Sequence, residues 1–271
     1  MAQSGEEIAQ VARLDSYFDL ARSSVLQRIT NKVCDCGHIG LSNANRSEAD
    51  QIMSEVGMDR KTTLLDLGAG AGWPGLYFAK HSGCSVTLLD LPEEGLKIAA
   101  ERAAEDGISG QVHIERGDAS RMPFENGSFS VITHSDVLCC LLRKREVLEE
   151  CRRVIVNNGQ MAFSVIDIAP DLSGPERAEA IDAGPEFVQS ETSYPDMLAE
   201  AGWRVVRCDD VTPGLARTYE GMIHADQEHE QELREVAGDD YFEDEVISMK
   251  KKLSAVQRGL LRRYLFFVRP T

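Results

Sequence analysis

The residues of this chain best placed to do chemistry lie in one short stretch, Leu64 to Gly75, which reads LLDLGAGAGWPG. Its glycines at positions 68, 70 and 72 follow an apolar, strand-like run. Without a Cβ they can adopt positive φ and let a ligand lie against the main chain. Pro74 then suits the first turn of a helix. Because free N–H groups and a positive dipole end favour phosphate or carboxylate groups, the stretch predicts a site for a nucleotide-like ligand.

Two classes of nucleotide-like ligand fit this turn. Gly70, Gly72 and Gly75 match the GxGxxG of a dinucleotide site, and Asp90, at the end of the next apolar run SVTLLD, has the position of a ribose-binding acid. Asp66, however, places a carboxylate on the first strand directly before the turn, where most dinucleotide folds have an apolar residue. A nicotinamide-dependent oxidoreductase therefore stays open as the alternative.

The same stretch resembles the D/E-x-G-x-G-x-G motif of the class I S-adenosylmethionine-dependent methyltransferases. Further matches to this family follow in order: Asp90-Leu91 after the second expected strand, Gly117-Asp118-Ala119 after the third, residues 122–129 before the fourth and residues 152–159 before the fifth. Ser130 and Asn158 depart from the family, which usually has Asp and Gly there. The resemblance is close from about Leu64 to Asp167, looser over the whole chain, and points to the small-molecule branch.

The resemblance implies S-adenosylmethionine as the cofactor, with Asp90 binding the ribose hydroxyls and Asp118 the adenine amino group. The cofactor-binding residues that it predicts are Asp66, Gly68, Gly70, Gly72, Asp90, Leu91, Asp118, Ala119 and His134. The cofactor supplies the reactive methyl group, so the protein mainly orients the acceptor and excludes water. A hydroxyl or protonated amine acceptor also needs a base. We expect His134 and Asp136, at the end of the fourth strand, to be catalytic; the alternative for His134 is a buried packing role.

Strands and helices alternate through Asp167, which predicts a parallel sheet with helices on both faces. With the family resemblance, the expected fold class is α/β: a Rossmann-like doubly wound seven-stranded sheet, mostly parallel with an antiparallel last strand, plus a helical lid. Ligands of such sheets bind at the carboxyl ends of the strands. The acids at positions 66, 90 and 118 and His134 all fall at those ends.

The expected organisation is a single methyltransferase domain over residues 1–271. Residues 1–45 would form an N-terminal helical lid, 46–168 the cofactor-binding core, and 169–195 and 212–260 inserted lid segments before the last strand. Apolar periodicity predicts one helix from Glu6 to about Ile29, and Ser47 is expected to cap the helix that ends at Val56. The substrate-binding residues expected in the lids are Tyr17, His38, Tyr219, Met222 and His224.

Composition limits the partners. The chain has 29 Lys and Arg against 45 Asp and Glu, a net charge of −16, and a pI of about 4.8. Because affinity for nucleic acid rests on cationic side chains, we expect a small-molecule acceptor and no nucleic-acid substrate. A signal peptide and a membrane-spanning run are absent from the pattern, so we expect a cytoplasmic protein without membrane contact; a homo-oligomer is left open.

The seven cysteines show no repeated spacing, which predicts reduced thiols and no metal site. Two further alternatives stay open. One is a regulatory protein that binds S-adenosylmethionine without turning over an acceptor. The other is an arsenite or thiol methyltransferase that would use Cys34 or Cys36.

Overall fold

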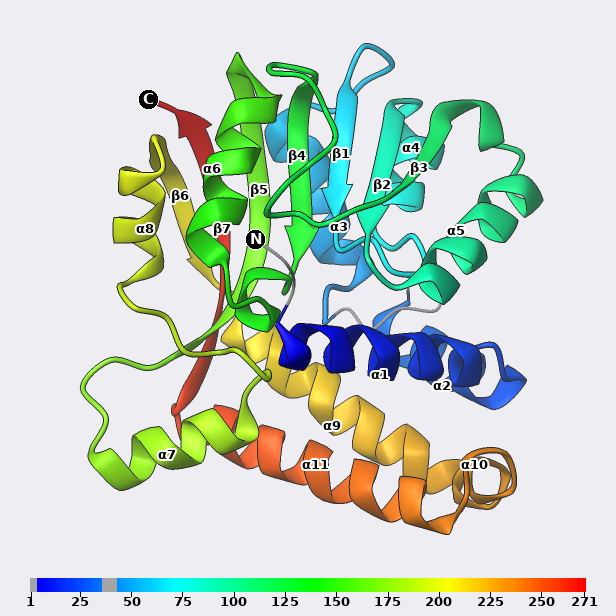
Figure 1. Ribbon diagram of the computed structural model, residues 1–271. Helices are drawn as coiled ribbons and strands as arrows, with labels where there is room; N and C mark the ends of the chain where they lie inside the picture. Colours follow the sequence, from blue (N-terminus) through cyan, green and yellow to red (C-terminus); the bar gives the residue numbers. More distant parts are fainter. Residues whose placement is uncertain (1–3, 36–42) are drawn as a thin grey trace.

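The computed structural model describes residues 4–35 and 43–271, which contain one seven-stranded sheet in the order β3-β2-β1-β4-β5-β7-β6 (Figure 1). The strands are β1 Thr63–Leu67, β2 Ser85–Asp90, β3 Val112–Arg116, β4 Phe129–Ser135, β5 Ile155–Ile168, β6 Trp203–Asp210 and β7 Leu261–Pro270. β7 runs antiparallel to its neighbours β5 and β6, and the other adjacent pairs are parallel. The predicted fold class is confirmed.

Helices cover both faces of this sheet and one of its ends. They are α1 Gly5–Ala21, α2 Ser24–Cys34, α3 Arg46–Val56, α4 Gly75–Ser82, α5 Glu93–Glu105, α6 Lys144–Val154, α7 Gly174–Ala183, α8 Tyr194–Glu200, α9 Thr212–Glu228, α10 Glu230–Ala237 and α11 Asp239–Gln257. Figure 1 shows α1 lying across one end of the sheet, with α9 and α11 beneath it. The segment between β6 and β7 therefore supplies a helical layer below the strands.

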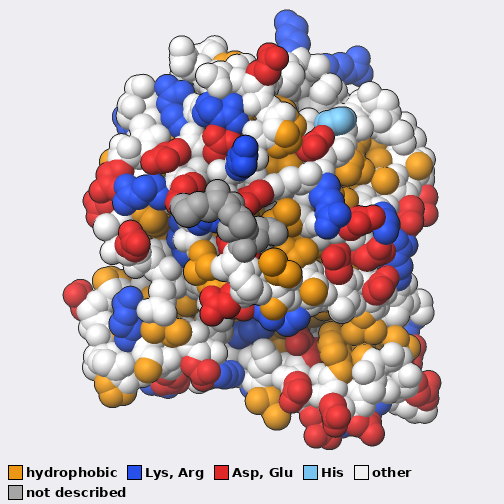
Figure 2. Space-filling view, in the orientation of Figure 1, with side chains coloured by type: hydrophobic (Ala, Val, Ile, Leu, Met, Phe, Trp, Pro, Cys, Tyr) orange, Lys and Arg blue, Asp and Glu red, His pale blue; other side chains and the backbone are white. Residues whose placement is uncertain are grey.

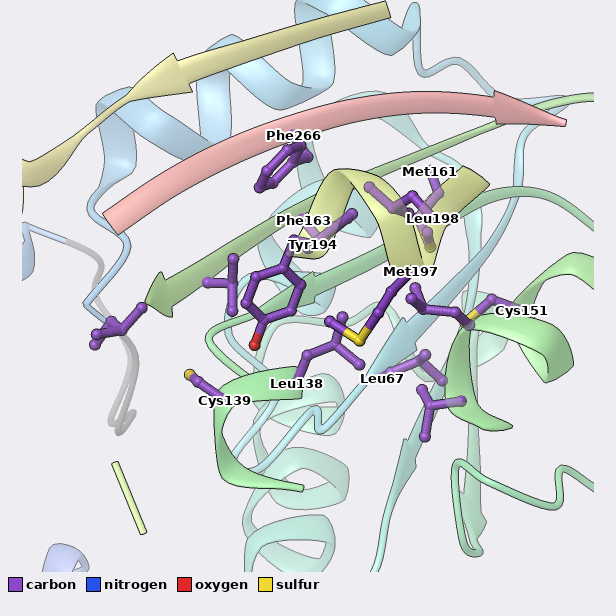
Figure 3. Packing of buried hydrophobic residues seen from close by; sticks show 14 of the residues in the cluster. Leu67, Leu138, Cys139, Cys151, Met161, Phe163, Tyr194, Met197, Leu198 and Phe266 are labelled. Atoms are coloured by element: carbon purple, nitrogen blue, oxygen red, sulfur yellow. The ribbon is translucent and has the colours of Figure 1, made fainter. Parts of the chain in front are cut away.

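The central strands β1 and β4 read as largely apolar runs because both faces of the sheet are buried there. Leu64 and Leu65 are neighbours in β1, and successive side chains of a strand point to opposite faces. Leu64 belongs to a core with side chains of α3, α4 and α5, whereas Leu65 belongs to a core with α6 and α8. Figure 3 shows the second core, in which the rings of Phe163 and Phe266 stack with centroids 5.1 Å apart.

Two predictions about helix ends are wrong. The single helix expected from Glu6 to Ile29 is two helices, because Ser23 has an extended backbone (φ −64°, ψ 141°) and starts α2 as its N-cap residue. The cap of α3 is Asn45 rather than Ser47: its side-chain oxygen accepts a hydrogen bond from the backbone N–H of Glu48. Asparagine and serine both cap helices well, so composition alone did not separate the two positions.

One buried arginine joins four elements around the end of β4. Arg263 of β7 is 1% exposed and donates to both carboxylate oxygens of Glu48 in α3, at 2.6 and 2.8 Å. Its Nε lies 2.9 and 3.0 Å from the carboxylate oxygens of Asp136, and its Nη2 lies 2.7 Å from Ser164 Oγ of β5. Every charge in this network has a partner, which is the condition under which buried ions are tolerated.

The cysteines and the hydropathy of the helices bear on two further predictions. Cys34, the last residue of α2, is disulfide-bonded, which contradicts the expectation of a reduced thiol there. The free cysteines in the described residues are Cys84, Cys139, Cys140, Cys151 and Cys208. Within the described ranges, none of the helices has the length and apolar character needed to cross a membrane.

Candidate functional site

A cavity of about 380 Å³ lies between the carboxyl ends of the strands and helices α1, α9 and α11. It is the place where the topology predicts a ligand, because β1 and β4 are the strands from which the connections run in opposite directions. Its described lining comprises residues 10, 11, 14, 18, 43, 66–71, 73, 74, 90–92, 135–137, 140, 141, 166, 183, 185, 219, 249 and 252. Four strand ends and the helices α1, α7, α9 and α11 therefore share one space.

Asp66 fixes the glycine loop. Its side chain is 1% exposed and accepts hydrogen bonds from Thr133 Oγ1 at 2.7 Å and from the backbone N–H of Gly75 at 3.1 Å. Burial raises the pKa of Asp66 to about 7 against these two hydrogen bonds. Because Gly75 begins α4, the carboxyl group ties the start of that helix to β1. The loop between them is thus held in one shape.

The glycines of the loop are needed for space as well as for conformation. A Cβ on Gly68 (φ 61°) would lie 2.4 Å from Val137 Cγ2, and one on Gly70 (φ 49°) would lie 2.9 Å from the ring of Phe18. Gly68 and Gly70 line the cavity. Gly72 (φ 96°) is not among the lining residues, and a Cβ there would meet Leu76 Cδ1 at 2.5 Å. Gly72 therefore shapes the loop rather than the cavity.

Asp90 presents a carboxylate to the cavity at the end of β2. Oδ2 accepts from the backbone N–H of Gly70 at 2.7 Å and Oδ1 from that of Leu91 at 2.8 Å. A carboxylate has about four acceptor positions, so two remain for ligand hydroxyls. Burial raises the pKa of Asp90 to about 6. The group stays ionised at neutral pH and can accept hydrogen bonds there.

A second, smaller cavity of about 60 Å³ continues from Asp90 to Asp118 and Ala119. Here the side chain of Arg143 donates to Asp118 Oδ2 at 2.9 Å and to Glu7 of α1 at 3.1 Å. Burial favours protonation of Asp118, but Ser120 and Arg143 hold the pKa of its carboxyl below the usual range. Sequence analysis missed Arg143 and Glu7, because neither belongs to a motif and 136 positions separate them.

These residues fit S-adenosylmethionine. Asp90 offers free acceptor positions for ribose hydroxyls, and the bare main chain at Gly68 and Gly70 admits close approach of a ligand. The smaller cavity at Asp118 adjoins Asp90, as an adenine ring beside its ribose requires. The cofactor-binding roles of these residues remain predictions, and their arrangement around connected cavities supports them.

The structure places the imidazole of His134 away from the cavity, which speaks against the catalytic and cofactor-binding roles predicted for it. The imidazole is 2% exposed, lies outside the cavity lining and stacks on Phe163 with ring centroids 4.5 Å apart. Neither ring nitrogen has a hydrogen-bond partner in the described part of the chain. Burial lowers the pKa of His134 to about 3, so the ring is neutral. β4 ends at Ser135 and the left-handed backbone of Asp136 (φ 54°) turns the chain, so Ser135 and Asp136 line the cavity while the ring of His134 packs in the core.

The first prediction follows from the buried imidazole. His134→Leu should keep turnover within about twofold of the wild type, because the ring touches no ligand space. Since the unfolded chain binds a proton near pH 6.5 and the folded ring does not, the wild type should lose about 2 kcal/mol more stability than the variant between about pH 7.5 and pH 5. Urea unfolding of both proteins at the two pH values measures this difference. Equal losses would show that the imidazole titrates normally.

Asp136 does line the cavity, in a left-handed backbone conformation (φ 54°). Its carboxylate accepts from Arg263 and, at 3.0 Å, from Asn43 Nδ2. These bonds fix the group in place as a hydrogen-bond acceptor. Its catalytic role stays a prediction.

The residues predicted to bind substrate divide into two groups. Tyr219 of α9 lines the cavity, whereas Tyr17 and Met222 line a separate small space between α1, α2, α9, α10 and α11. His224 is exposed and pairs with Glu228. The structure therefore places Tyr17, Met222 and His224 away from this cavity, and His38 lies outside the described residues. At Tyr17 the error is one helical position: its neighbour Phe18 faces the cavity.

Comparison with known proteins agrees with this geometry. Residues 65–163 match a family described as a methyltransferase domain. A sarcosine/dimethylglycine N-methyltransferase from Aphanothece halophytica is 25% identical over 74% of this chain and 73% of its own length, and a 27-O-demethylrifamycin SV methyltransferase from Amycolatopsis mediterranei is 24% identical over 73% and 74%.

A solved structure shows the same fold. It is a geranyl diphosphate C-methyltransferase from Streptomyces coelicolor A3(2) in complex with S-adenosyl-L-homocysteine. The TM-score is 0.68, and the sequences are 16% identical; the match covers 83% of this chain and 79% of that one. None of these findings supports a nicotinamide oxidoreductase or a non-catalytic regulatory protein. Residues 65–163 thus form a methyltransferase domain, and the fold, the site and the relatives together support a class I S-adenosylmethionine-dependent methyltransferase that acts on a small-molecule acceptor.

Proposed function

We propose that the methyl acceptor binds in the part of the cavity between the glycine loop and helices α9 and α11. The observation that carries this proposal is the continuity of the cavity: Asp90 and Gly68 line one part, and Tyr219 and Met249 line another. Cofactor and acceptor would then be bound side by side in one space. Holding two reactants together in this way is the main cause of acceleration in a reaction catalysed by proximity.

In this proposal Tyr219 and Asp136 orient the acceptor. Burial, reinforced by the nearby charge of Asp136, raises the pKa of Tyr219, so the phenol keeps its proton and donates a hydrogen bond. Asp136 is held by Arg263 and accepts one. A donor and a fixed acceptor in a mostly apolar space can fix the direction of a small polar group.

The second prediction tests this placement. Tyr219→Ala should raise the KM of the acceptor about tenfold while the Kd of S-adenosylhomocysteine stays unchanged. His224→Ala on the same helix is the matched control, because that side chain is exposed, and it should change neither quantity. The acceptor panel starts from the compounds named for the relatives: sarcosine, dimethylglycine and geranyl diphosphate. A loss of S-adenosylhomocysteine binding in Tyr219→Ala would move this residue to the cofactor half of the cavity.

We also propose that the protein works in the cytoplasm as a single domain with α1 and the helices between β6 and β7 as its lids, and without nucleic acid. The net charge of −16 supports the last point. Figure 2 shows acidic side chains gathered at the lower right of the face in view, where α10 lies and α11 begins in Figure 1. An electrophoretic shift assay with RNA and DNA at low salt should show no complex.

A further inference from the structure

Four side chains with a formal charge line the described part of the cavity, and three of them already have partners. Asp66 is bonded to Thr133, Asp90 accepts two backbone N–H groups, and Asp136 is paired with Arg263. The fourth is Lys252 of α11, the one Lys or Arg among the described lining residues. In the described part of the chain its ammonium group has neither a hydrogen bond nor an ion pair, although acids outnumber bases in this protein by 45 to 29.

We propose that Lys252 is a specificity-determining residue that binds an anionic group, a carboxylate or a phosphate, of the methyl acceptor. The inference rests on the function proposed above and adds the chemical class of the acceptor. An ammonium group on a flexible stem is a compact point charge that binds either anion. Because the other charged groups of the cavity already have partners, the ammonium group of Lys252 can pair with a ligand.

The direction of Lys252 is specific within a run of three lysines. Successive residues of an α-helix are rotated by about 100°, so only one of the three can face the cavity. Lys251 pairs with Asp182 of α7, and Lys250 is exposed. Lys252 instead shares the cavity face with Met249, three positions earlier on the same helix. The neighbouring lysines Lys250 and Lys251 therefore serve as controls for a substitution at Lys252.

The place of Lys252 in the fold favours the acceptor over the cofactor as its ligand. The ribose acid Asp90 ends β2, and the sheet order continues from β2 through β1 and β4 to β5. Ile166 of β5, Ala183 of α7 and Met249 of α11 line the cavity on this far side. Lys251 pairs with α7, which ties this part of α11 to the same side. The acceptor would therefore present its anionic end to α11 and α7.

The apolar part of the cavity lining also indicates the rest of the acceptor. Ile166, Ala183, Pro185 and Met249 offer apolar atoms. A lysine can lay its methylene stem along such a surface while its charged head meets a polar group. The inferred acceptor has an apolar body and one anionic group.

The test uses simple probes on the full-length protein saturated with S-adenosylhomocysteine. Isothermal titration should show hexanoate and hexyl phosphate binding about tenfold more tightly than hexan-1-ol, and hexylamine more weakly than the alcohol. In Lys252→Met the preference for the two anions should disappear and the affinity for hexan-1-ol should remain. Comparison of hexanoate with hexyl phosphate decides which anion the site prefers.

Two controls separate the possible failures. Lys250→Met makes the same substitution at an exposed position and should keep the preference for anions. The Kd of S-adenosylhomocysteine should be the same in both variants and the wild type. If the wild type binds S-adenosylhomocysteine but does not prefer the anionic probes, this inference is wrong and the proposed function stands. A Kd of S-adenosylhomocysteine that rises in Lys252→Met alone would also overturn it, because Lys252 would then bind the cofactor. Failure of the wild type to bind S-adenosylhomocysteine would instead refute the proposed function.

Discussion

Arg263→Met should lower the free energy of unfolding by about 3–5 kcal/mol, the largest loss we expect from one substitution in this chain. The side chain is 1% exposed and neutralises Glu48 and Asp136, whose side chains are 11% and 9% exposed. Methionine fills much of the same volume but leaves two carboxylates in the interior without their cation. Urea denaturation followed by the fluorescence of Trp73 and Trp203 measures the loss, because both tryptophans are buried.

Arg262→Met is the matched control. Arg262 is the preceding residue of β7 and is exposed, so the same substitution should change stability by no more than about 0.5 kcal/mol. Adding Glu48→Gln to Arg263→Met should recover part of the loss, because it removes one of the two stranded charges. Equal stability of the two methionine variants would mean that the network contributes nothing.

Asp90→Asn should raise the Kd of S-adenosylhomocysteine by about 5-fold to 150-fold, the equivalent of 1–3 kcal/mol for a charged hydrogen-bond acceptor. The amide keeps the size of the side chain but replaces one acceptor oxygen with a donor, which faces a backbone N–H of Gly70 or Leu91. Isothermal titration at about pH 7.5 gives both dissociation constants. Asp240→Asn, an exposed position on α11, makes the same change of charge and should leave the Kd unaltered.

The same carboxylate predicts how binding depends on pH. Burial raises the pKa of Asp90 to about 6, and the ionised carboxylate is the form that accepts hydrogen bonds from the ribose hydroxyls. Affinity for S-adenosylhomocysteine should therefore be constant above about pH 7 and fall as the pH drops through 6. In Asp90→Asn this part of the fall should be missing. A pH dependence identical in the two proteins would assign the titration to another group, and an unchanged Kd at neutral pH would overturn the ribose site.

The cofactor half of the site could be predicted because it follows from local sequence. Asp66 is the second-last residue of β1, Asp90 is the last residue of β2, and Asp118 lies two residues beyond β3; the carboxyl ends of parallel strands meet at one edge. Local pattern also sufficed for the strands, since burial on both faces gives continuous apolar runs. These features need no knowledge of which distant segments touch.

The acceptor half could not be predicted to the residue. Residues two apart in a strand share a face, so alternation does not separate His134 from Asp136. The choice depends on where the strand stops: β4 ends at Ser135, and Asp136 has a left-handed backbone (φ 54°). Tyr17 and Phe18 differ by one step around a helix whose orientation is set by distant contacts with α5. Lys252 carries no signal within its run of lysines. In each case tertiary placement, absent from the local pattern, decides.

The position of β7 has a consequence for the order in which the molecule can assemble during synthesis. Domains form from the N-terminal side as the chain emerges, and β1 to β4, with the glycine loop, precede β7 by more than a hundred residues. β6 pairs only with β7 in the described sheet. Asp136 has no ion pair with Arg263 until β7 has been synthesised. A nascent chain could thus form its cofactor half early, yet gain a finished acceptor half only when its last strand is in place.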